Sequence, residues 1–255
     1  MRPRWQAGPS TLVLVRHGES LGNQAAAAAR ASGAEALELR ERDADVPLSE
    51  TGRHQARALG AWLAETGGSD TGGPTVAVAS PYRRASDTAR LALEGLEVPL
   101  EHDERLRERD LGVLDRLTGT GVRARHPQEA ERRQHLGKFY YQPPSGESWA
   151  DVALRVRSLL HDLAEYDGER VWLFTHQAVI MSFRLVLEGL DETRLLELDR
   201  QVRIPNASVT TYHRTGHHLG HHLELASFAD AAAVDRSSAH VTREAPATAR
   251  SADAH

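Results

Sequence analysis

Three short apolar runs, separated by helical patterns, constrain the fold of this chain most strongly. The runs span residues 12–15, 75–79 and 171–175. They do not alternate apolar with polar residues, so each is typical of a strand buried on both faces, as in a parallel sheet. Strands that alternate with helices predict an α/β fold, a three-layer α/β/α sandwich with a mostly parallel central sheet.

Start signals for helices follow the runs. Ser49 is a predicted N-cap, and Ser148 with Asp151 resembles a capping box. Ser80 is another predicted N-cap, with Pro81 at the first helical position, where the missing N–H costs nothing.

The sequence predicts one domain over residues 1–228 and a disordered tail over 229–255. A chain of 255 residues can bury a substantial core. Near its end, "SVTTYHR" and "HLELASF" predict a hairpin or edge strands, whereas the tail shows no periodicity. Residues 178–187 are apolar nearly all round, which fits a core helix or a subunit interface, so the oligomeric state stays open.

Composition excludes several classes of protein. The net charge of −5 gives no general attraction to nucleic acid or to an anionic membrane. The absence of cysteine excludes a thiol nucleophile, a disulfide framework and a Cys-ligated zinc. The N-terminal "MRPRWQAGPS" lacks an apolar signal region, and no apolar run approaches the ~18 residues of a membrane helix, so a cytoplasmic protein is expected.

A histidine-rich segment, "HHLGHH" at residues 217–222, is the one candidate metal site. Its four-residue spacing would suit a pair of ligands on a helix. Gly216 and Gly220 disfavour a helix there, so we expect a histidine-rich turn, with no metal and no cofactor.

Charged and imidazole side chains follow the ends of all three predicted strands. Arg16 and His17 end the first, Arg84 lies in the first turn of the helix after the second, and His176 ends the third. Alone, each has an ordinary interpretation, such as a solvated arginine or a structural histidine. The carboxyl ends of parallel strands meet at one edge of a sheet, where helix N-termini favour a bound phosphate. Together the residues therefore predict a phosphate site.

Six motifs give the chain a family resemblance. In order they are "RHGESLGN", "PLSETGRHQA", "SPYRRASDTA", "RERDLG", "SGES" and "THQAV". Over about residues 10–215 they resemble the histidine phosphatase superfamily, whose founding member is cofactor-dependent phosphoglycerate mutase. The resemblance implies a phosphoglycerate mutase-like fold.

The resemblance also implies roles for individual residues. His17 would be the nucleophile that becomes a phosphohistidine, and Glu108 would donate a proton to the leaving oxygen. The groups that would surround the phosphoryl group are Arg16, Arg84, His176 and Asn23. These roles need His17 neutral, with its second nitrogen donating to a carbonyl, and Glu108 with a raised pKa. Without the resemblance, Glu108 reads as one surface acid in a charged run.

The second half resembles one branch, the bisphosphatase domain of 6-phosphofructo-2-kinase/fructose-2,6-bisphosphatase. That likeness implies substrate-binding roles for Lys138, Arg133 and Gln177. The departures from the branch are Gly119 and Trp149 in place of tyrosines, and Met181 in place of an arginine, with Arg184 one turn further along. These departures favour a basic pocket for some other polar phosphorylated substrate.

We therefore expect a metal-independent phosphatase that acts on a small phosphorylated metabolite through His17. One alternative is a phosphoglycerate-type mutase, which would return the phosphoryl group to substrate. The other is a phospho-ligand binding module without catalysis, although such a module would not need Glu108.

Overall fold

A six-stranded sheet lies at the centre of the protein, in the strand order β3-β2-β4-β1-β5-β6. The computed structural model describes residues 7–67, 72–216, 221–237 and 239–243. The strands are β1 (Thr11–Arg16), β2 (Val76–Ala79), β3 (Leu100–His102), β4 (Arg170–Thr175), β5 (Val209–Thr215) and β6 (His222–Asp230). Strands β1 to β4 pair in parallel, and β5 pairs antiparallel with β1 and β6. The predicted mostly parallel sheet is confirmed.

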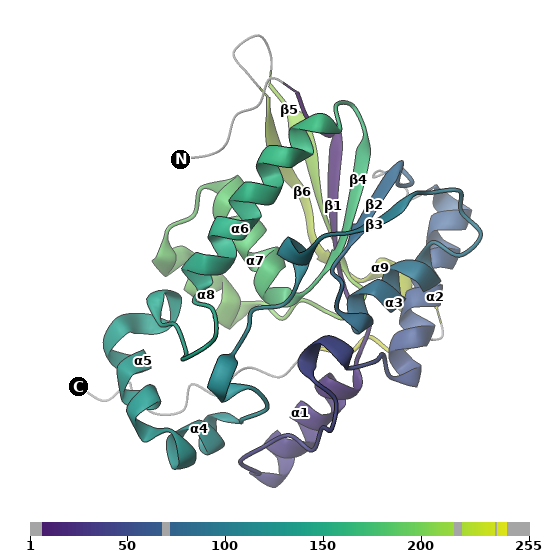
Figure 1. The fold of residues 1–255 in the computed structure, drawn as a ribbon. Coiled ribbons are helices and arrows are strands. Elements are labelled where there is room, and N and C mark those ends of the chain that lie inside the picture. The colour runs from purple at the N-terminus through teal and green to yellow at the C-terminus, as the bar shows by residue number, and fades with distance from the viewer. Residues whose placement is uncertain (1–6, 68–71, 217–220, 238, 244–255) are drawn as a thin grey trace.

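Helices cover both faces of this sheet (Figure 1). They are α1 (Leu21–Ser32), α2 (Glu50–Thr66), α3 (Arg83–Ala92), α4 (Gly119–Arg125), α5 (Pro127–Tyr140), α6 (Trp149–Asp162), α7 (Gln177–Glu188), α8 (Glu192–Gln201) and α9 (Ala232–Asp235). Helices α6, α7 and α8 pack on one face, and α2, α3 and α9 on the other. This arrangement is the three-layer α/β/α sandwich that the sequence predicts.

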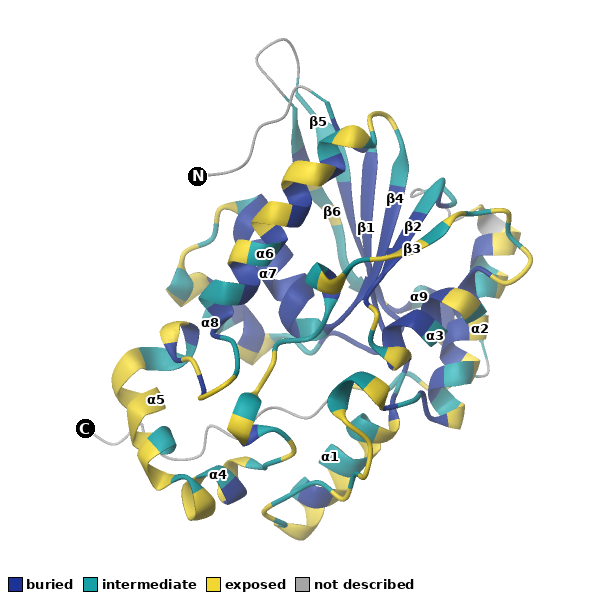
Figure 2. Ribbon diagram, in the orientation of Figure 1, coloured by how far each residue is buried: buried dark blue, intermediate teal, exposed yellow. Residues whose placement is uncertain are grey.

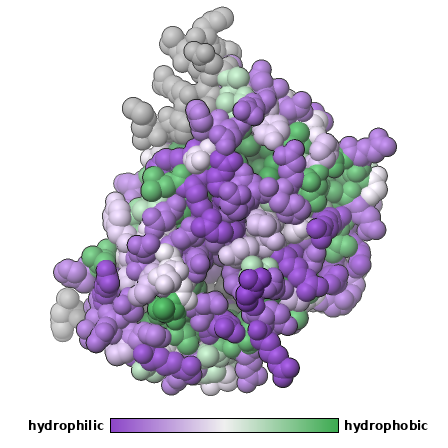
Figure 3. All heavy atoms as spheres, viewed as in Figure 1, coloured by the Kyte–Doolittle hydropathy of each residue, from purple (hydrophilic) through white to green (hydrophobic). Residues whose placement is uncertain are grey.

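Burial on both faces explains why the strand sequences do not alternate. On β1, Leu12 and Leu14 join the α6–α7 core, whereas Val13 and Val15 join the α2–α3 core. All four side chains are fully buried. Figure 2 shows the central strands buried along most of their length, in contrast to the largely exposed α5. The surface seen in Figure 3 is mainly hydrophilic, with hydrophobic atoms in separate small groups.

Two predicted helix caps are confirmed. Ser49 caps α2 by accepting a hydrogen bond from the Gly52 amide at 3.0 Å. Ser148 and Asp151 form the capping box of α6. The serine oxygen accepts from one free amide while the aspartate accepts from another, which fixes where α6 begins.

The predicted N-cap at Ser80 is wrong. Helix α3 begins at Arg83, and its N-cap is Tyr82, which makes no side-chain capping bond. The Ser80 hydroxyl instead accepts from the Tyr82 amide at 3.2 Å and lies 2.9 Å from Nε2 of His176. The Ser80 hydroxyl, which the local sequence predicts to cap a helix, instead makes a long-range contact with His176.

Secondary structure continues beyond residue 228, the predicted end of the domain. The hairpin of β5 and β6 is confirmed, and β6 continues to Asp230. Helix α9 follows, with Val234 fully buried and Ala233 packed in the α2–α3 core. This helix has four residues, too few for a periodic pattern to reveal it. Residues 244–255 of the predicted tail lie outside the described residues.

Most of the "HHLGHH" segment also lies outside the described residues, at 217–220. Within the described part of the chain, no cluster of three or more potential metal ligands occurs. No helix there is both long enough and apolar enough to cross a membrane. The apolar run 178–187 forms α7 and is buried within this single chain, which assigns it to the core.

Helices α1, α4 and α5 lie beyond the carboxyl edge of the parallel strands (Figure 1). The loop after α1 is joined to the start of α4 by a bridge between Ala36 and Leu117 and by a 3.0 Å bond from the Thr118 amide to the Glu35 carbonyl. These segments therefore form a separate layer over the sheet edge where the predicted phosphate site lies.

Candidate active site

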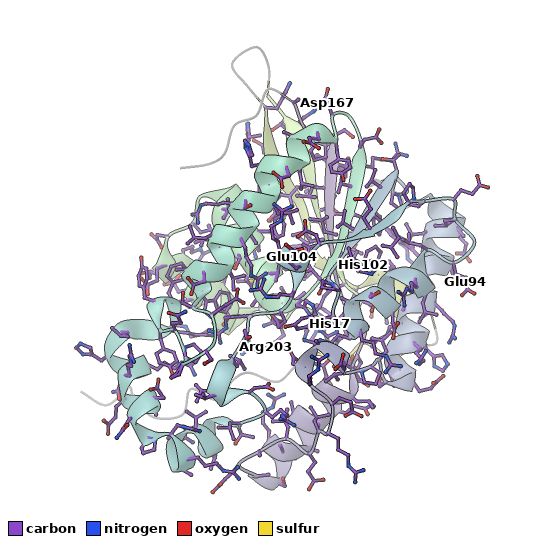
Figure 4. The ribbon with its side chains drawn as sticks, viewed as in Figure 1. His17, Glu94, His102, Glu104, Asp167 and Arg203 are labelled. Carbon is purple, nitrogen blue, oxygen red and sulfur yellow. The ribbon has the colours of Figure 1, made fainter. Side chains whose placement is uncertain are left out.

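The register of the parallel strands brings the predicted site residues to one edge. Arg16 pairs with Thr175, and Ala79 pairs with Phe174, so β1, β2 and β4 end level with one another. His17 and His176 each follow directly on these ends. Their ring centroids are 5.1 Å apart. Figure 4 shows His17 beyond the ends of the central strands, between the sheet and α1.

The ring of His17 is held in one tautomer. Its Nδ1 lies 2.7 Å from the Gly18 carbonyl oxygen, which can only accept, so Nδ1 carries the proton. The Nε2 atom therefore carries the lone pair. Burial lowers the pKa of His17 well below its ordinary value, and the charges of Arg84 and Arg16 lower it further. The imidazole is thus neutral and nucleophilic at Nε2.

The second imidazole, His176, is fully buried at the N-cap of α7. Burial also lowers the pKa of this ring well below its ordinary value. The Ser80 hydroxyl accepts from the Tyr82 amide and lies 2.9 Å from Nε2 of His176, to which it can donate its own hydrogen. In that arrangement the imidazole proton is on Nδ1, a buried atom with no partner among the described residues. Such a donor is suited to an oxygen of a bound ligand.

Two arginines supply the positive charge. Arg16 is 1% exposed, and its guanidinium donates to the Ile204 carbonyl. Arg84, at the start of α3, donates through NH1 to the Asp43 backbone carbonyl at 2.6 Å and pairs with its carboxylate at 2.9 Å. The positive charges of Arg16 and Arg84 each lower the pKa of His17 and of His176, so both guanidinium groups act on both imidazoles. Planar guanidinium groups in this position suit a phosphoryl group.

The loop that carries His17, residues 17–20 and here called the histidine loop, is held by a close backbone approach. A Cβ on Gly18 would lie 2.5 Å from the Gly52 carbonyl oxygen, and a Cβ on Gly52 would lie 1.9 Å from the Glu19 carbonyl oxygen. The Gly18 amide also donates to Thr88 in α3 at 3.0 Å. The glycines of "RHG" and of "TGRHQA" therefore allow α2 to press against the histidine loop.

Glu108 lies in the segment before the turn η4 (Gly112–Leu114). Burial is the main cause that raises the pKa of its carboxyl group, and the charge of Asp43 adds to it. The Arg109 amide, which donates to Glu108 Oε1 at 2.8 Å, and the charges of Arg84 and Arg155 oppose the rise. A carboxyl group with a raised pKa keeps its proton to higher pH and can serve as an acid.

Known proteins with similar sequences agree with this geometry. The model of the histidine phosphatase superfamily (branch 1) matches residues 12–223. The chain belongs to the histidine phosphatase superfamily. The fold and family expected from the six motifs are confirmed.

Individual relatives of this chain differ in activity. The 2,3-bisphosphoglycerate-dependent phosphoglycerate mutase 2 of Gloeobacter violaceus is 32% identical over 204 residues, which cover 77% of the chain and 84% of the mutase. The 6-phosphofructo-2-kinase/fructose-2,6-bisphosphatase 3 of Bos taurus is 30% identical over 70% of the chain but only 33% of its own length. A mycobacterial glucosyl-3-phosphoglycerate phosphatase, solved with inorganic phosphate, shares 28% identity at a TM-score of 0.65, covering 87% of this chain and 98% of that structure.

Asn23 and Gln177 border the candidate site. Asn23 Oδ1 accepts from the Ser20 amide at 3.0 Å and from Asn206 Nδ2 at 3.3 Å. That leaves the Asn23 amide nitrogen without a hydrogen bond among the described residues. Gln177 begins α7, and its Oε1 is buried without a partner in the described part of the chain.

The predicted substrate lysine, Lys138, lies with Arg109 around one indole ring. Lys138 Nζ lies 5.4 Å from the ring centroid of Trp149, and the Arg109 guanidinium lies 5.8 Å from it. Lys138 also pairs with Asp199 at 2.5 Å. Arg133 is exposed, and its charge lowers the pKa of both Arg109 and Lys138, although burial is the larger cause for each. These three cations form the basic cluster.

Arg184 does not belong to this cluster. Its guanidinium pairs with Glu188 at 2.7 Å and lies 3.9 Å from the ring centroid of Phe228 on β6. The carboxylate of Glu188 also accepts from Tyr212 at 3.0 Å. Arg184 therefore belongs to a contact between α7 and the sheet, and does not take the place of the arginine that the related branch has at the position of Met181.

Several residues around the site escape sequence reasoning. Glu147 of the "SGES" motif pairs with Arg107 at 2.6 Å and with Arg155 at 3.0 Å, and Arg155 donates to the Glu108 carbonyl at 3.3 Å. Glu147 lies in a recognised motif, but the sequence assigned it no role, and only the tertiary structure shows that it braces the Glu108 segment. Asp43 lies in none of the six motifs, so the sequence did not indicate a role for it.

Replacing Asp43 with asparagine is expected to lower the inhibition constant of inorganic phosphate about threefold to tenfold. The Asp43 carboxylate contacts both terminal nitrogens of Arg84. A phosphoryl group would bind the same two nitrogens, so it competes with this carboxylate. Removing the negative charge of Asp43 removes this competition. Competitive inhibition by phosphate measures the change.

The matched control is Asp45→Asn on the same 3-10 turn, η1 (Asp43–Asp45). Asp45 pairs with Arg42 at 2.6 Å, and both side chains are largely exposed, so phosphate inhibition should not change. Weaker inhibition in Asp43→Asn would mean that Asp43 positions Arg84 instead of competing for it.

Proposed function

We propose that this chain is a metal-independent phosphatase that hydrolyses a small phosphorylated metabolite through a phosphohistidine on His17. The observation that carries the proposal is the state of the His17 ring. Its Nδ1 is tied to a carbonyl and its Nε2 has a lone pair, beside a second imidazole and two arginines. This is the arrangement that nucleophilic attack on phosphorus requires.

In the first step, Nε2 of His17 attacks phosphorus and the bond from phosphorus to the substrate oxygen breaks. Negative charge spreads over the three equatorial oxygens, which Arg16, Arg84 and the Nδ1–H of His176 would stabilise. Glu108 would give its proton to the leaving oxygen, since an alkoxide leaves poorly without an acid. Asn23 and Gln177 are proposed to bind further oxygen or hydroxyl groups of the substrate.

In the second step, a water molecule attacks the phosphohistidine. The Glu108 carboxylate accepts a proton from this water, the phosphorus–nitrogen bond breaks, and phosphate leaves with His17 restored as the neutral imidazole. The guanidinium groups supply the positive charge for both steps, so the route needs neither a metal nor a cofactor.

The basic cluster supports a substrate with a second anionic group. It holds three cations, Arg109, Arg133 and Lys138, of which Lys138 is neutralised by Asp199. Arg109 directly follows Glu108 in the chain, on the leaving-group side of the proposed reaction. A carboxylate or second phosphate on the alcohol part of the substrate would match this excess positive charge. The names of the mycobacterial and bovine relatives describe phosphatases of such substrates.

A phosphoglycerate-type mutase is the second candidate, favoured by the relative from Gloeobacter violaceus. The same phosphohistidine would serve both reactions. A mutase would return the phosphoryl group to an alcohol, whereas a phosphatase would pass it to water.

The proposal is tested by a screen of phosphate monoesters with the purified chain. We expect phosphate release that a chelator does not reduce, with a higher kcat/KM for esters bearing a second anionic group than for neutral ones. Conversion of 3-phosphoglycerate only with a bisphosphorylated primer, and without phosphate release, would establish the mutase. Binding of phosphate without turnover of any ester would establish the binding module.

A further inference from the structure

A short segment near the C-terminus returns to the histidine loop after α9. This segment, residues 239–243, is here called the C-terminal strap. The strap accepts two hydrogen bonds from Gln55 Nε2, at the His240 carbonyl (2.7 Å) and at Thr242 Oγ1 (2.9 Å). Thr242 also accepts at its carbonyl from the Asn206 amide (2.9 Å) and donates from Oγ1 to Asn206 Oδ1 (3.1 Å). One threonine therefore holds two buried amide side chains.

Both amide side chains reach the histidine loop on their other side. Gln55 Oε1 accepts from the Glu19 backbone amide at 2.8 Å, and Asn206 Nδ2 donates to the His17 carbonyl at 3.1 Å. Gln55 is 0% exposed and Asn206 is 1% exposed, so water does not compete for these bonds. The strap is thus connected to the loop on both sides of Gly18.

The strap dictates which way each amide faces. The His240 carbonyl can only accept, so Gln55 must present its nitrogen to the strap and its oxygen to Glu19. Thr242 Oγ1 accepts a hydrogen bond from Gln55 and donates its own hydroxyl hydrogen to Asn206 Oδ1. Asn206 must then present its oxygen to Thr242 and its nitrogen to the His17 carbonyl.

The Glu19 amide and the Gly18 carbonyl belong to one planar peptide unit. When Gln55 holds that N–H, it also fixes the carbonyl that accepts from His17 Nδ1. If the peptide rotated, Nδ1 would lose its acceptor and the ring could place its proton on Nε2. A protonated Nε2 cannot attack phosphorus.

We propose that Thr242 is a positioning residue that selects the nucleophilic tautomer of His17 through Gln55 and Asn206. The inference rests on the proposed role of His17. Thr242 lies beyond residue 223, where the match to the family model ends. Its proposed role is therefore an addition to the chemistry of the family.

The test is Thr242→Val in the full chain, since valine keeps the shape and removes both hydroxyl bonds. We expect kcat for a phosphate ester to fall about tenfold with KM changed less than about twofold. Nitrogen NMR of the imidazole, assigned with His17→Ala, should change from the single Nδ1–H tautomer to a mixture. Thr242→Ser should restore both properties, and Thr215→Val, at the far end of β5, should alter neither.

A folded Thr242→Val protein with wild-type kcat and a single tautomer would overturn the inference, as would a serine variant that fails to restore them. Thermal unfolding confirms folding, and Thr242→Ala repeats the test without the extra methyl group. The tautomer signal does not depend on turnover. A wild-type protein inert toward every ester, but with a tautomer that shifts in Thr242→Val, would therefore refute the proposed function and keep the inference.

Discussion

Replacing His17 with alanine is expected to reduce turnover of every phosphate ester by about 10⁴-fold or more. The variant lacks the atom to which the phosphoryl group is transferred, so arginines and acid alone cannot complete either step. Rapid quenching of the wild type with labelled substrate should trap a phosphorylated protein whose phosphorus–nitrogen bond is acid-labile and base-stable. The variant should trap none.

A matched control is His102→Ala. His102 lies on β3, the edge strand of the sheet, is exposed, and contacts Ser86 at 2.8 Å. This variant should keep turnover within about twofold, as expected for a surface residue. If His17→Ala retained substantial turnover, or if label appeared on another residue, the phosphohistidine proposal would be refuted.

The second large effect is expected for Glu108→Gln, whose consequence should depend on the leaving group. For an alkyl phosphate we expect kcat to fall about 10²- to 10⁴-fold, because the amide cannot protonate an alkoxide. For p-nitrophenyl phosphate, whose leaving group needs no proton, formation of the phosphohistidine should be nearly unaffected. Single-turnover kinetics on the two substrates measure the difference. Equal losses on both would contradict the role of Glu108 as an acid.

The direction of the pKa shifts also fixes the pH dependence. Glu108 must be protonated to act, and its pKa is raised, so kcat/KM should fall as the pH rises through that raised value. His17 must be neutral, and its pKa is lowered, so activity should persist below the pH at which an ordinary histidine becomes charged. Activity should therefore be highest on the acidic side of neutrality, and Glu108→Gln should remove the decline at high pH.

The matched control for Glu108→Gln is Glu104→Gln. Glu104 lies in the same charged run, on the turn η3 (Glu104–Leu106), and is exposed. It should leave both the leaving-group dependence and the pH profile unchanged. A similar effect of the two substitutions would indicate that loss of local charge, and not loss of the acid, is responsible.

The sheet and the central residues of the site could be predicted because their signals are local. A strand buried on both faces must be apolar at every position, so β1 and β4 are visible in sequence, and Arg16, His17 and His176 stand out where those strands end. The convergence of these residues then follows from parallel register alone.

The supporting residues could not be predicted, because their partners are distant in the chain. Asp43 meets Arg84 across 41 positions, and Asn206 meets the His17 carbonyl across 189. Neither has a periodic or capping pattern that would mark it. The same limit explains the error at Ser80, where a contact with His176 takes precedence over a local cap.

Lys138 has a practical consequence for chemical labelling. It is the one lysine in the sequence, and burial lowers its pKa, so more of its side chain is the uncharged amine at mild pH. Apart from the α-amino group, acylating reagents thus have a single nitrogen target, held against Trp149 and Asp199. A reporter coupled there would sense a ligand bound at the basic cluster without any engineered attachment point.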